Sequence, residues 1–286
     1  MFNRNRIKEI TDNSLDYPKE WKVFSDAPKR VYAVGDLTLL KERKFVVVGS
    51  RRTPVPALKL GESIARTLSN NVVIVTGTAD GGDSAAIEGA LAGGGKVICV
   101  LAGGFSSISQ TDFPLMERVA KSGLILSPHP YDTAVRSFSY EYRNKLLAAL
   151  GEGVLVLGAA EKSGALITAR YAHGQKKPIF AFPYFPGSAA GEGCNAILKG
   201  GGILTENVFD VARAMNINLE ERMLHTVQLT ADELKVMSVL RDLAEAHIME
   251  IAAGASMPTY KTKAVLSSLE VKGVVISVGG NRYKPL

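Results

Sequence analysis

The chain has 286 residues, 46% of them hydrophobic and 22% charged, which allows a substantial core in one large domain with a smaller one beside it. Lysine and arginine exceed aspartate and glutamate by 34 to 28, and this net charge of +6 suits a polyanionic partner. The start of the chain has no apolar segment for a signal peptide, and no apolar run approaches membrane-spanning length. Two distant cysteines make no metal motif and are typical of a reducing compartment, so we expect a cytoplasmic protein with no membrane partner.

The first 40 residues have the least regular pattern. Trp21 stands between two prolines, Pro18 and Pro28, without a clear helical or strand period. We expect residues 1–40 to form a partly ordered arm that packs on the main domain.

Short apolar runs rich in valine and isoleucine follow from Phe45 onward and alternate with helical patterns. Several are apolar throughout, as in strands that are covered on both faces of a parallel sheet. The predicted strands are 45–48, 72–76, 96–101, 124–127, 154–157, 178–182 and 203–205.

The segments between these strands have helical spacing. One apolar face runs from Ala57 to Leu68, Asp83 is placed to cap a second helix, and Pro114 suits the first turn of a third. The predicted helices include 83–91, 114–121, 141–150 and 163–173. This alternation predicts an α/β fold over residues 41–220, with a Rossmann-like, doubly wound, mostly parallel sheet.

The pattern changes over residues 221–286. Three helical segments, 232–246, 248–253 and 260–272, precede a two-stranded hairpin that turns at residues 279–281. Three helices and such a wing predict a small C-terminal winged-helix domain. Its lysines could hold duplex DNA, and winged helices also contact proteins, so both partners remain open.

Four glycine-bearing turns follow predicted strands, at residues 49–52, 77–83, 101–105 and 159–169. Glycine lets backbone N–H groups approach a phosphate, and a helix N-terminus adds partial positive charge. Arg51 can add a planar guanidinium. Any one such turn is more often only a tight connection, but four on one sheet edge favour a phosphate-bearing ligand. None is the full dinucleotide fingerprint or a P-loop.

A second cluster, "RSFSYEYRNKLLAAL" at residues 136–150, interleaves three aromatic residues with cations. Aromatic rings stack on unpaired bases while cations follow the backbone, as in single-strand binding. A core helix with surface tyrosines in its leading loop is the alternative, and the residues alone do not separate the two. The four histidines form no metal spacing, and we expect neither a metal site nor a catalytic residue.

The order of "VVVGSR", "GTADGGDSAAIEGAL", "RNKLLAAL", "SGALITARYA", "GCNAIL" and "GGILTENVFDV" resembles the DNA processing protein A family, DprA or Smf. The resemblance covers roughly residues 45–211, and residues 229–286 look like that family's C-terminal module. It implies a non-enzymatic, homodimeric protein without a cofactor that binds single-stranded DNA. It also implies that the protein helps to load the RecA recombinase onto incoming DNA during natural transformation.

The resemblance assigns a phosphate contact to Arg51 and base stacking to Tyr140. The DNA-binding residues that it and the glycine turns imply are Gly49, Ser50, Arg51, Arg52, Tyr140, Arg143, Asn144, Lys145, Ser163, Gly164, Thr168 and Lys199.

Three positions depart from the family pattern. Asp80 stands in place of a basic residue, Thr111 in place of a lysine-type contact, and Glu141 in place of proline. Each exchange removes positive charge or adds negative charge along the expected DNA groove, and one acid in place of one base costs about 1 kcal/mol of phosphate binding. We therefore expect a divergent member with reduced DNA affinity or an altered ligand.

Two other functions remain open. One is an enzyme or sensor for a nucleotide, although "GGFSS" and "EKSG" lack the glycine-threonine-glutamate pattern of nucleoside monophosphate hydrolysis. The other is a transcription regulator whose core senses a ligand while the winged helix reads duplex DNA.

Overall fold

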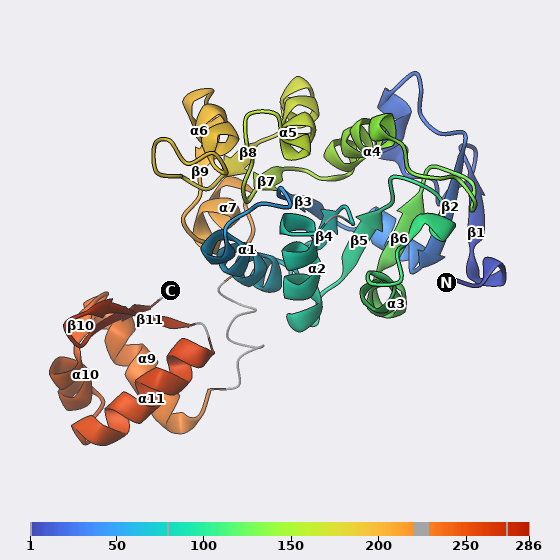
Figure 1. Ribbon diagram of the computed structural model, residues 1–286. Helices are drawn as coiled ribbons and strands as arrows, with labels where there is room; N and C mark the ends of the chain where they lie inside the picture. Colours follow the sequence, from blue (N-terminus) through green and yellow to red (C-terminus); the bar gives the residue numbers. More distant parts are fainter. Residues whose placement is uncertain (1, 79, 220–228, 273, 286) are drawn as a thin grey trace. The chain divides into compact units, whose positions relative to one another are not determined.

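The computed structural model describes residues 2–78, 80–219, 229–272 and 274–285 (Figure 1). The chain divides into two units, Met1–Leu219 and Glu220–Leu286. We call them the core unit and the C-terminal unit and describe each by itself. Within the described residues, no helix is both long enough and apolar enough to cross a membrane.

A nine-stranded sheet forms the middle layer of the core unit, in the order β1-β2-β6-β5-β4-β3-β7-β8-β9. Its strands are β1 (Lys8–Thr11), β2 (Arg30–Gly35), β3 (Lys44–Val48), β4 (Val73–Thr76), β5 (Val97–Val100), β6 (Leu124–Ser127), β7 (Val154–Val156), β8 (Ile179–Ala181) and β9 (Ile203–Leu204). The strands from β6 to β9 in this order are all parallel, whereas β2 pairs antiparallel with both β6 and β1. The prediction of a large, mostly parallel sheet is therefore confirmed.

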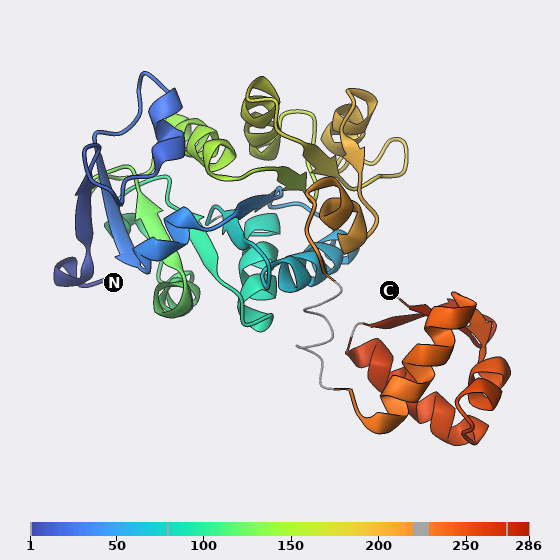
Figure 2. The same ribbon diagram turned by 180° about the vertical axis from the view of Figure 1, so that it is seen from behind.

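Helices cover both faces of this sheet (Figures 1 and 2). The helices of the core unit are α1 (Val55–Leu68), α2 (Gly82–Ala92), α3 (Phe113–Ser122), α4 (Ser137–Leu150), α5 (Gly164–Gly174), α6 (Glu192–Lys199) and α7 (Val208–Ala214). On one face α1 packs between α2 and α7, with α3 next to α2, while α4, α5 and α6 cover the other face. Burial on both sides explains why every residue of β3, β4, β5 and β6 is buried.

The first 40 residues contribute two strands, β1 and β2, to the sheet, although their sequence has no clear strand pattern. Their pattern is weak because β1 lies at the edge of the sheet and buries only Ile10. The short 3-10 helix η2 (Lys19–Val23) carries Trp21, which is fully buried and donates a hydrogen bond of 3.0 Å from its indole Nε1 to the carbonyl of Leu146 in α4. These contacts attach residues 2–40 to the rest of the core unit.

The order of the strands creates a crevice between β3 and β7. From β3 the chain adds β4, β5 and β6 on one side, then returns through α4 to place β7 on the other side of β3. The helices that follow β3 and β7, α1 and α5, lie on opposite faces, so the loops after these two strands diverge. Ligands of open α/β sheets bind at this switch point, beyond the carboxyl ends of the strands.

The described residues of the C-terminal unit form three helices and a three-stranded sheet. The helices are α9 (Ala231–Leu243), α10 (Ile248–Gly254) and α11 (Thr259–Val271), and the strands are β10 (Ala246–His247), β11 (Val275–Gly279) and β12 (Arg282–Pro285) in the order β10-β12-β11. The buried side chains of Val236, Leu240, Ile251, Leu266 and Leu269 form a core of its own. The antiparallel pair β11 and β12 encloses Gly280, whose φ of +57° suits a tight turn.

Candidate functional site

A pocket of about 380 Å³ lies at the crevice between β3 and β7, and we call it the rim pocket. It lies among the loop after β3, the first turns of α5 and the first half of α4. The sequence-predicted residues that line it are Gly49, Ser50, Arg51, Tyr140, Arg143, Asn144, Ser163, Gly164 and Thr168. The fold thus brings together three motifs whose first and last residues, Gly49 and Thr168, are more than 90 positions apart in the sequence.

The loop after β3 holds Arg51 at the mouth of the rim pocket. A Cβ on Gly49 would lie 2.9 Å from the Cα of Gly82, so the two backbones meet only because both residues are glycine. The Ser50 amide donates to the carbonyl of Gly158 at 2.8 Å, which ties the turn to the loop after β7. The Arg51 side chain is exposed, and no carboxylate of the described residues lies within ion-pair distance of it. Its guanidinium is available to an anion.

The N-terminus of α5 forms another wall of the rim pocket. Ser163 caps this helix by accepting a hydrogen bond from the Ala165 amide at 3.3 Å. Asn144 of α4 donates through Nδ2 to the carbonyl of Gly164 at 3.0 Å, which fixes the first turn of α5 against α4. Unpaired N–H groups at a helix N-terminus carry partial positive charge, so this wall also favours an anion.

Thr168 presents an unsatisfied hydroxyl to the same pocket. The residue is fully buried on α5, and its Oγ1 has no hydrogen-bond partner among the described residues. A buried hydroxyl without a partner costs free energy, which a bound acceptor can recover. The hydroxyl is suited to donate to a phosphate oxygen.

Arg143 forms the floor of the rim pocket and pairs with Asp83 of α2. Its Nη1 lies 3.6 Å from Asp83 Oδ2 and 3.3 Å from the carbonyl oxygen of Val100, and only 4% of Arg143 is exposed. Burial lowers the pKa of Arg143, while the Asp83 carboxylate raises it. A Cβ on Gly77 would lie 1.5 Å from Nη1, so that glycine is required to admit the guanidinium. The charge of Arg143 is therefore partly neutralised by Asp83.

Asp83 was expected to cap a helix, and the structure differs. The N-cap residue of α2 is Gly81, and Asp83 lies in the first turn with its side chain buried beside Arg143. Because the two residues are 60 positions apart, no local pattern could identify this pair. The only indication of this ion pair in the sequence was an acidic residue in a largely apolar helix.

Tyr140 separates the rim pocket from a second, smaller pocket. Its ring is 39% exposed, and the Arg143 guanidinium carbon lies 6.0 Å from its centroid. The second pocket, of about 220 Å³, shares Arg51 and Tyr140 with the rim pocket, and we call it the side pocket. Ser107 and Ser109 also line it, so this wall can form hydrogen bonds.

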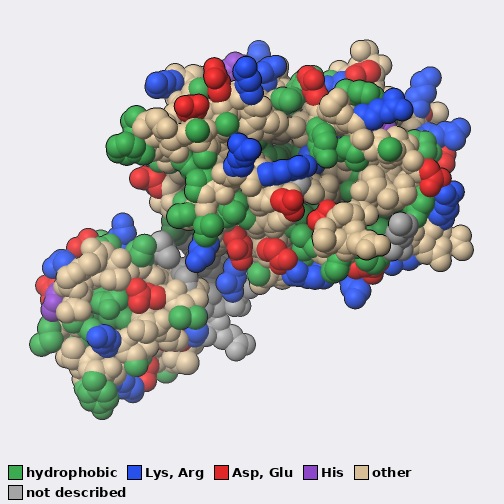
Figure 3. Space-filling model, viewed as in Figure 1, with side chains coloured by type: hydrophobic (Ala, Val, Ile, Leu, Met, Phe, Trp, Pro, Cys, Tyr) green, Lys and Arg blue, Asp and Glu red, His purple; other side chains and the backbone are tan. Residues whose placement is uncertain are grey.

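The departures from the family pattern fall at different places. Asp80 lines the side pocket together with Arg51, and Asp112 lines it as well, accepting a hydrogen bond of 2.6 Å from Ser109. Glu141 is exposed and lines neither pocket. Of the acids considered in the sequence, Asp80 is the one that faces the predicted site. Figure 3 shows basic side chains near the middle of this face of the core unit with acidic ones beside them.

Three of the predicted residues do not line the rim pocket. Lys145 contacts Asp26 in an ion pair and lies 4.6 Å above the Phe24 ring, so it fastens the N-terminal segment to α4. Lys199 ends α6, and a helix between two parallel strands runs antiparallel to them, which places Lys199 toward the opposite edge of the sheet. Arg52 is exposed beside Arg51 but outside the pocket.

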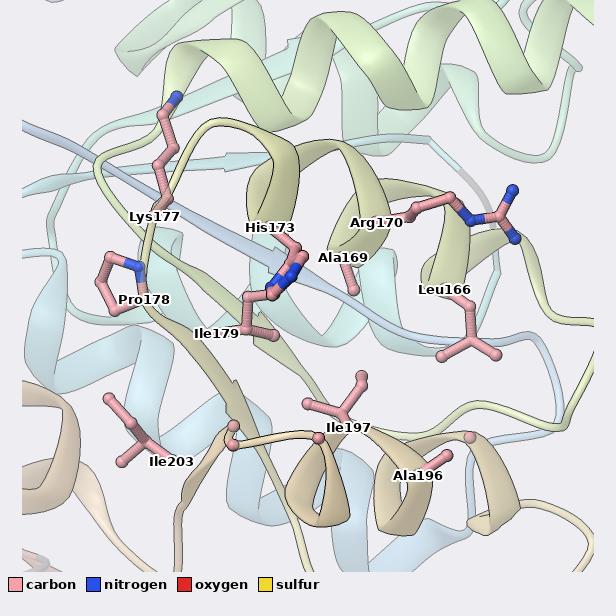
Figure 4. Close-up of a pocket in the computed structure, with 14 residues that line it drawn as sticks. Leu166, Ala169, Arg170, His173, Lys177, Pro178, Ile179, Ala196, Ile197 and Ile203 are labelled. Atoms are coloured by element: carbon pink, nitrogen blue, oxygen red, sulfur yellow. The ribbon is translucent and has the colours of Figure 1, made fainter.

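Another hollow, of about 510 Å³, lies between α5 and α6 (Figure 4). Leu166, Ile179, Ile197 and Ile203 line it, and Figure 4 shows the charged end of Lys177 directed away from it. None of the predicted site residues is among its lining residues. Arg170, His173 and Lys177 also line it, so the hollow is mostly apolar with a few basic side chains.

A family model described as DNA recombination-mediator protein A matches residues 8–216. The DNA processing protein DprA of Bacillus subtilis is 34% identical over 189 residues, which cover 64% of this chain and 62% of that protein. The matched part therefore spans less than two thirds of that relative.

Two solved structures resemble this chain over about three quarters of its length. The DNA processing protein A of Streptococcus pneumoniae superposes with a TM-score of 0.69 at 31% identity, covering 73% of this chain and 74% of that one. The DNA processing protein A of Helicobacter pylori, described for its single-stranded DNA binding mode, superposes with a TM-score of 0.67 at 29% identity, covering 74% of this chain and 96% of that one.

Proposed function

The chain belongs to the DNA recombination-mediator protein A family, and from this premise we propose that it binds single-stranded DNA at the rim pocket without catalysing a reaction. The observation that carries the proposal is the meeting of an unpaired arginine, a helix N-terminus and an exposed aromatic ring at one pocket. These are the parts that hold a phosphate and stack on a base.

The phosphate position is formed by Arg51, the first turn of α5 and the Thr168 hydroxyl. Arg51 supplies a full charge, because no described carboxylate pairs with it, and α5 supplies backbone N–H groups. Thr168 supplies a donor that has no other described partner. Arg143 acts mainly from below, by holding Asp83 and lying beneath the Tyr140 ring.

The base position is the exposed face of Tyr140. An aromatic face accepts any base, so binding there is tolerant of sequence. The adjoining side pocket offers room beside this ring, and its Asp80 carboxylate opposes a phosphate. We therefore propose that the backbone crosses the rim pocket and that affinity is modest and strongly dependent on salt.

The finer roles are proposals that rest on family membership. They are the delivery of the bound strand to the RecA recombinase, a setting in natural transformation, action in the cytoplasm, and a homodimeric state. Together they describe a mediator that covers incoming single strands and passes them to a recombinase.

We further propose that the C-terminal unit is a winged-helix module that contacts a protein rather than duplex DNA. Its residues 229–286 carry seven Lys and Arg residues against six Asp and Glu residues, so it holds little of the net charge. Lys261 pairs with Asp232 at 2.6 Å, and Arg282 pairs with Glu245 at 2.7 Å. Cations that are paired within the unit are less available to phosphates, whereas Tyr260 is 79% exposed.

The test is a titration of the full chain with oligo-dT at several low salt concentrations. Arg51→Ala should weaken binding and lower the dependence of log K on log salt by about 0.7, the value for one lost phosphate contact on a single strand. Arg66→Ala is the matched control, because Arg66 is exposed near the C-terminal end of α1, away from the rim pocket. A wild-type chain without affinity for oligo-dT at low salt would contradict the proposal.

A further inference from the structure

We propose that Phe185 is a second base-stacking position, which extends the single-strand path from Tyr140 across the loops after β7 and β8. The inference rests on the proposed function and adds to it a binding residue and a direction along the sheet edge. Phe185 is 85% exposed, an unusual state for a phenylalanine on an ordered loop.

The loop that carries Phe185 is rigidly held. Asn195 accepts a hydrogen bond from the Tyr184 amide at 3.0 Å and donates one to the Tyr184 carbonyl at 2.9 Å. The Tyr184 hydroxyl donates to the carbonyl of Leu157, and a Cβ on Gly191 would lie 1.9 Å from the Tyr184 ring. Tyr184 is therefore fixed on both sides, and it fixes the residue that follows it.

A tight turn holds Phe185 from its other side. The Ser188 amide donates to the Phe185 carbonyl at 3.1 Å, with Pro186 and Gly187 between them. Gly187 has a φ of +83°, and proline followed by such a glycine is the pattern of a type II turn. Because the backbone is fixed before and after Phe185, the ordered loop holds the Phe185 ring in its exposed position. Such a ring loses little entropy when a base stacks on it.

The loop also lies on the correct edge of the sheet. It follows β8, which is parallel to β7, and β7 is parallel to β3, so all three loops leave the same edge. The Gly193 amide donates to the carbonyl of Ala159 at 2.8 Å, which joins the first turn of α6, where the loop after β8 ends, to the loop after β7. Strands are spaced about 4.8 Å apart, so β8 lies roughly 10 Å from β3. A few nucleotides of an extended strand cover that distance.

The surface between the two rings suits a phosphate backbone. The N-terminus of α5 lies in the loop after β7, and Lys162 is exposed just before it, although Glu161 is exposed as well. On the β3 side, Arg51 and Arg52 are exposed. Aromatic rings at both ends of a cationic stretch are the arrangement that binds single strands without sequence preference. The alternative to DNA at this surface is a second copy of the chain that covers the Phe185 ring.

The experiment compares Phe185→Ala, Phe185→Leu and Phe185→Trp in the full chain, with oligo-dT at low salt. Leucine keeps an apolar side chain but removes the ring, so it should weaken binding as alanine does. We expect a loss of at least about five-fold, equivalent to about 1 kcal/mol, for both, and wild-type affinity or better for tryptophan. Oligonucleotides too short to span both rings should bind the alanine variant and the wild type equally.

Tryptophan emission gives a direct reading of contact. The chain has one tryptophan, Trp21, which is fully buried, so Phe185→Trp adds a single exposed reporter. Its emission should be quenched by oligo-dT. Leu15→Trp is the control, since Leu15 is 95% exposed after β1, seven strand positions from β8, and should not respond.

The outcomes separate the inference from the proposed function. If the wild type binds and Arg51→Ala weakens it, but Phe185→Ala and Phe185→Leu bind normally, the second stacking position is wrong and the rim pocket stands. If Phe185→Ala changes the molecular mass in light scattering and leaves DNA affinity intact, the ring contacts a second copy and the inference is overturned. If the wild type binds no oligo-dT, both fail together.

Discussion

Arg143 Nη1 and Asp83 Oδ2 lie 3.6 Å apart beneath the rim pocket, where the Arg143 and Asp83 side chains are only 4% and 5% exposed. Removing either partner leaves the other buried charge without this ion pair, and breaking a buried pair in this way costs about 3–5 kcal/mol. Arg143→Ala should therefore lower the free energy of unfolding by an amount in that range. Urea unfolding measures it.

The double variant Arg143→Leu with Asp83→Leu tests the origin of that cost. Because it removes both charges, it should be less destabilised than the sum of the two single variants. Additive losses would show that the pair is not coupled. Loss of DNA binding in Arg143→Ala alone would therefore report stability as well as contact, and Arg51→Ala is the cleaner test of the site.

Thr168→Val should separate binding from stability. Valine has the shape of threonine without the hydroxyl, and Oγ1 of Thr168 has no described hydrogen-bond partner. Removing a buried, unsatisfied hydroxyl should leave the free energy of unfolding unchanged or raise it. Binding to oligo-dT should weaken, by about 1.5–3 kcal/mol for one lost hydrogen bond to a charged acceptor. A destabilised variant with normal affinity would mean that the hydroxyl serves the fold.

Asp80→Lys should increase the affinity for single-stranded DNA. Asp80 lines the side pocket with Arg51 and opposes a phosphate there, whereas lysine at this position would attract one. We expect tighter binding and a steeper dependence on salt. Glu141→Lys is the matched control, because Glu141 is exposed and lines neither pocket, and its effect should be smaller. Equal gains from both variants would indicate only a general effect of net charge.

The C-terminal unit should lose stability in acid through Glu233. Burial raises the pKa of this carboxyl, but hydrogen bonds from Lys272, Thr230 and Ser268 outweigh burial and lower the pKa to about 2. Since the pKa is lower in the folded state, the charged form stabilises the fold above about pH 4.5, and this contribution is lost as the pH falls toward 2.

Glu233→Gln should then be less stable than the wild type at pH 7. The difference in unfolding free energy between the two should shrink between about pH 4.5 and pH 2, when the wild-type carboxyl becomes protonated. Urea unfolding of both proteins at several pH values measures this difference. A difference that does not vary with pH would contradict the assignment.

The sequence alone was sufficient for the regular part of the core unit. The strands β3, β4, β5 and β6 are buried throughout because both faces of the sheet are covered, and each contains a continuous apolar run that is visible in the sequence. Glycine-bearing turns after such strands indicated which edge would carry a site. The same local signals failed for β1, because a strand with a single buried residue shows no alternation of apolar and polar residues.

Only the tertiary structure decided which predicted cations face the rim pocket. Arg143 and Lys145 are two positions apart on α4, and their side chains therefore point to different sides of the helix. Arg143 lies under the pocket beside Asp83, while Lys145 pairs with Asp26, 119 residues away in the sequence. The neighbours of a residue in the sequence determine whether it lies in a helix or a strand. Its ion-pair partners depend on how distant helices, strands and loops pack together, and only the folded chain shows that packing.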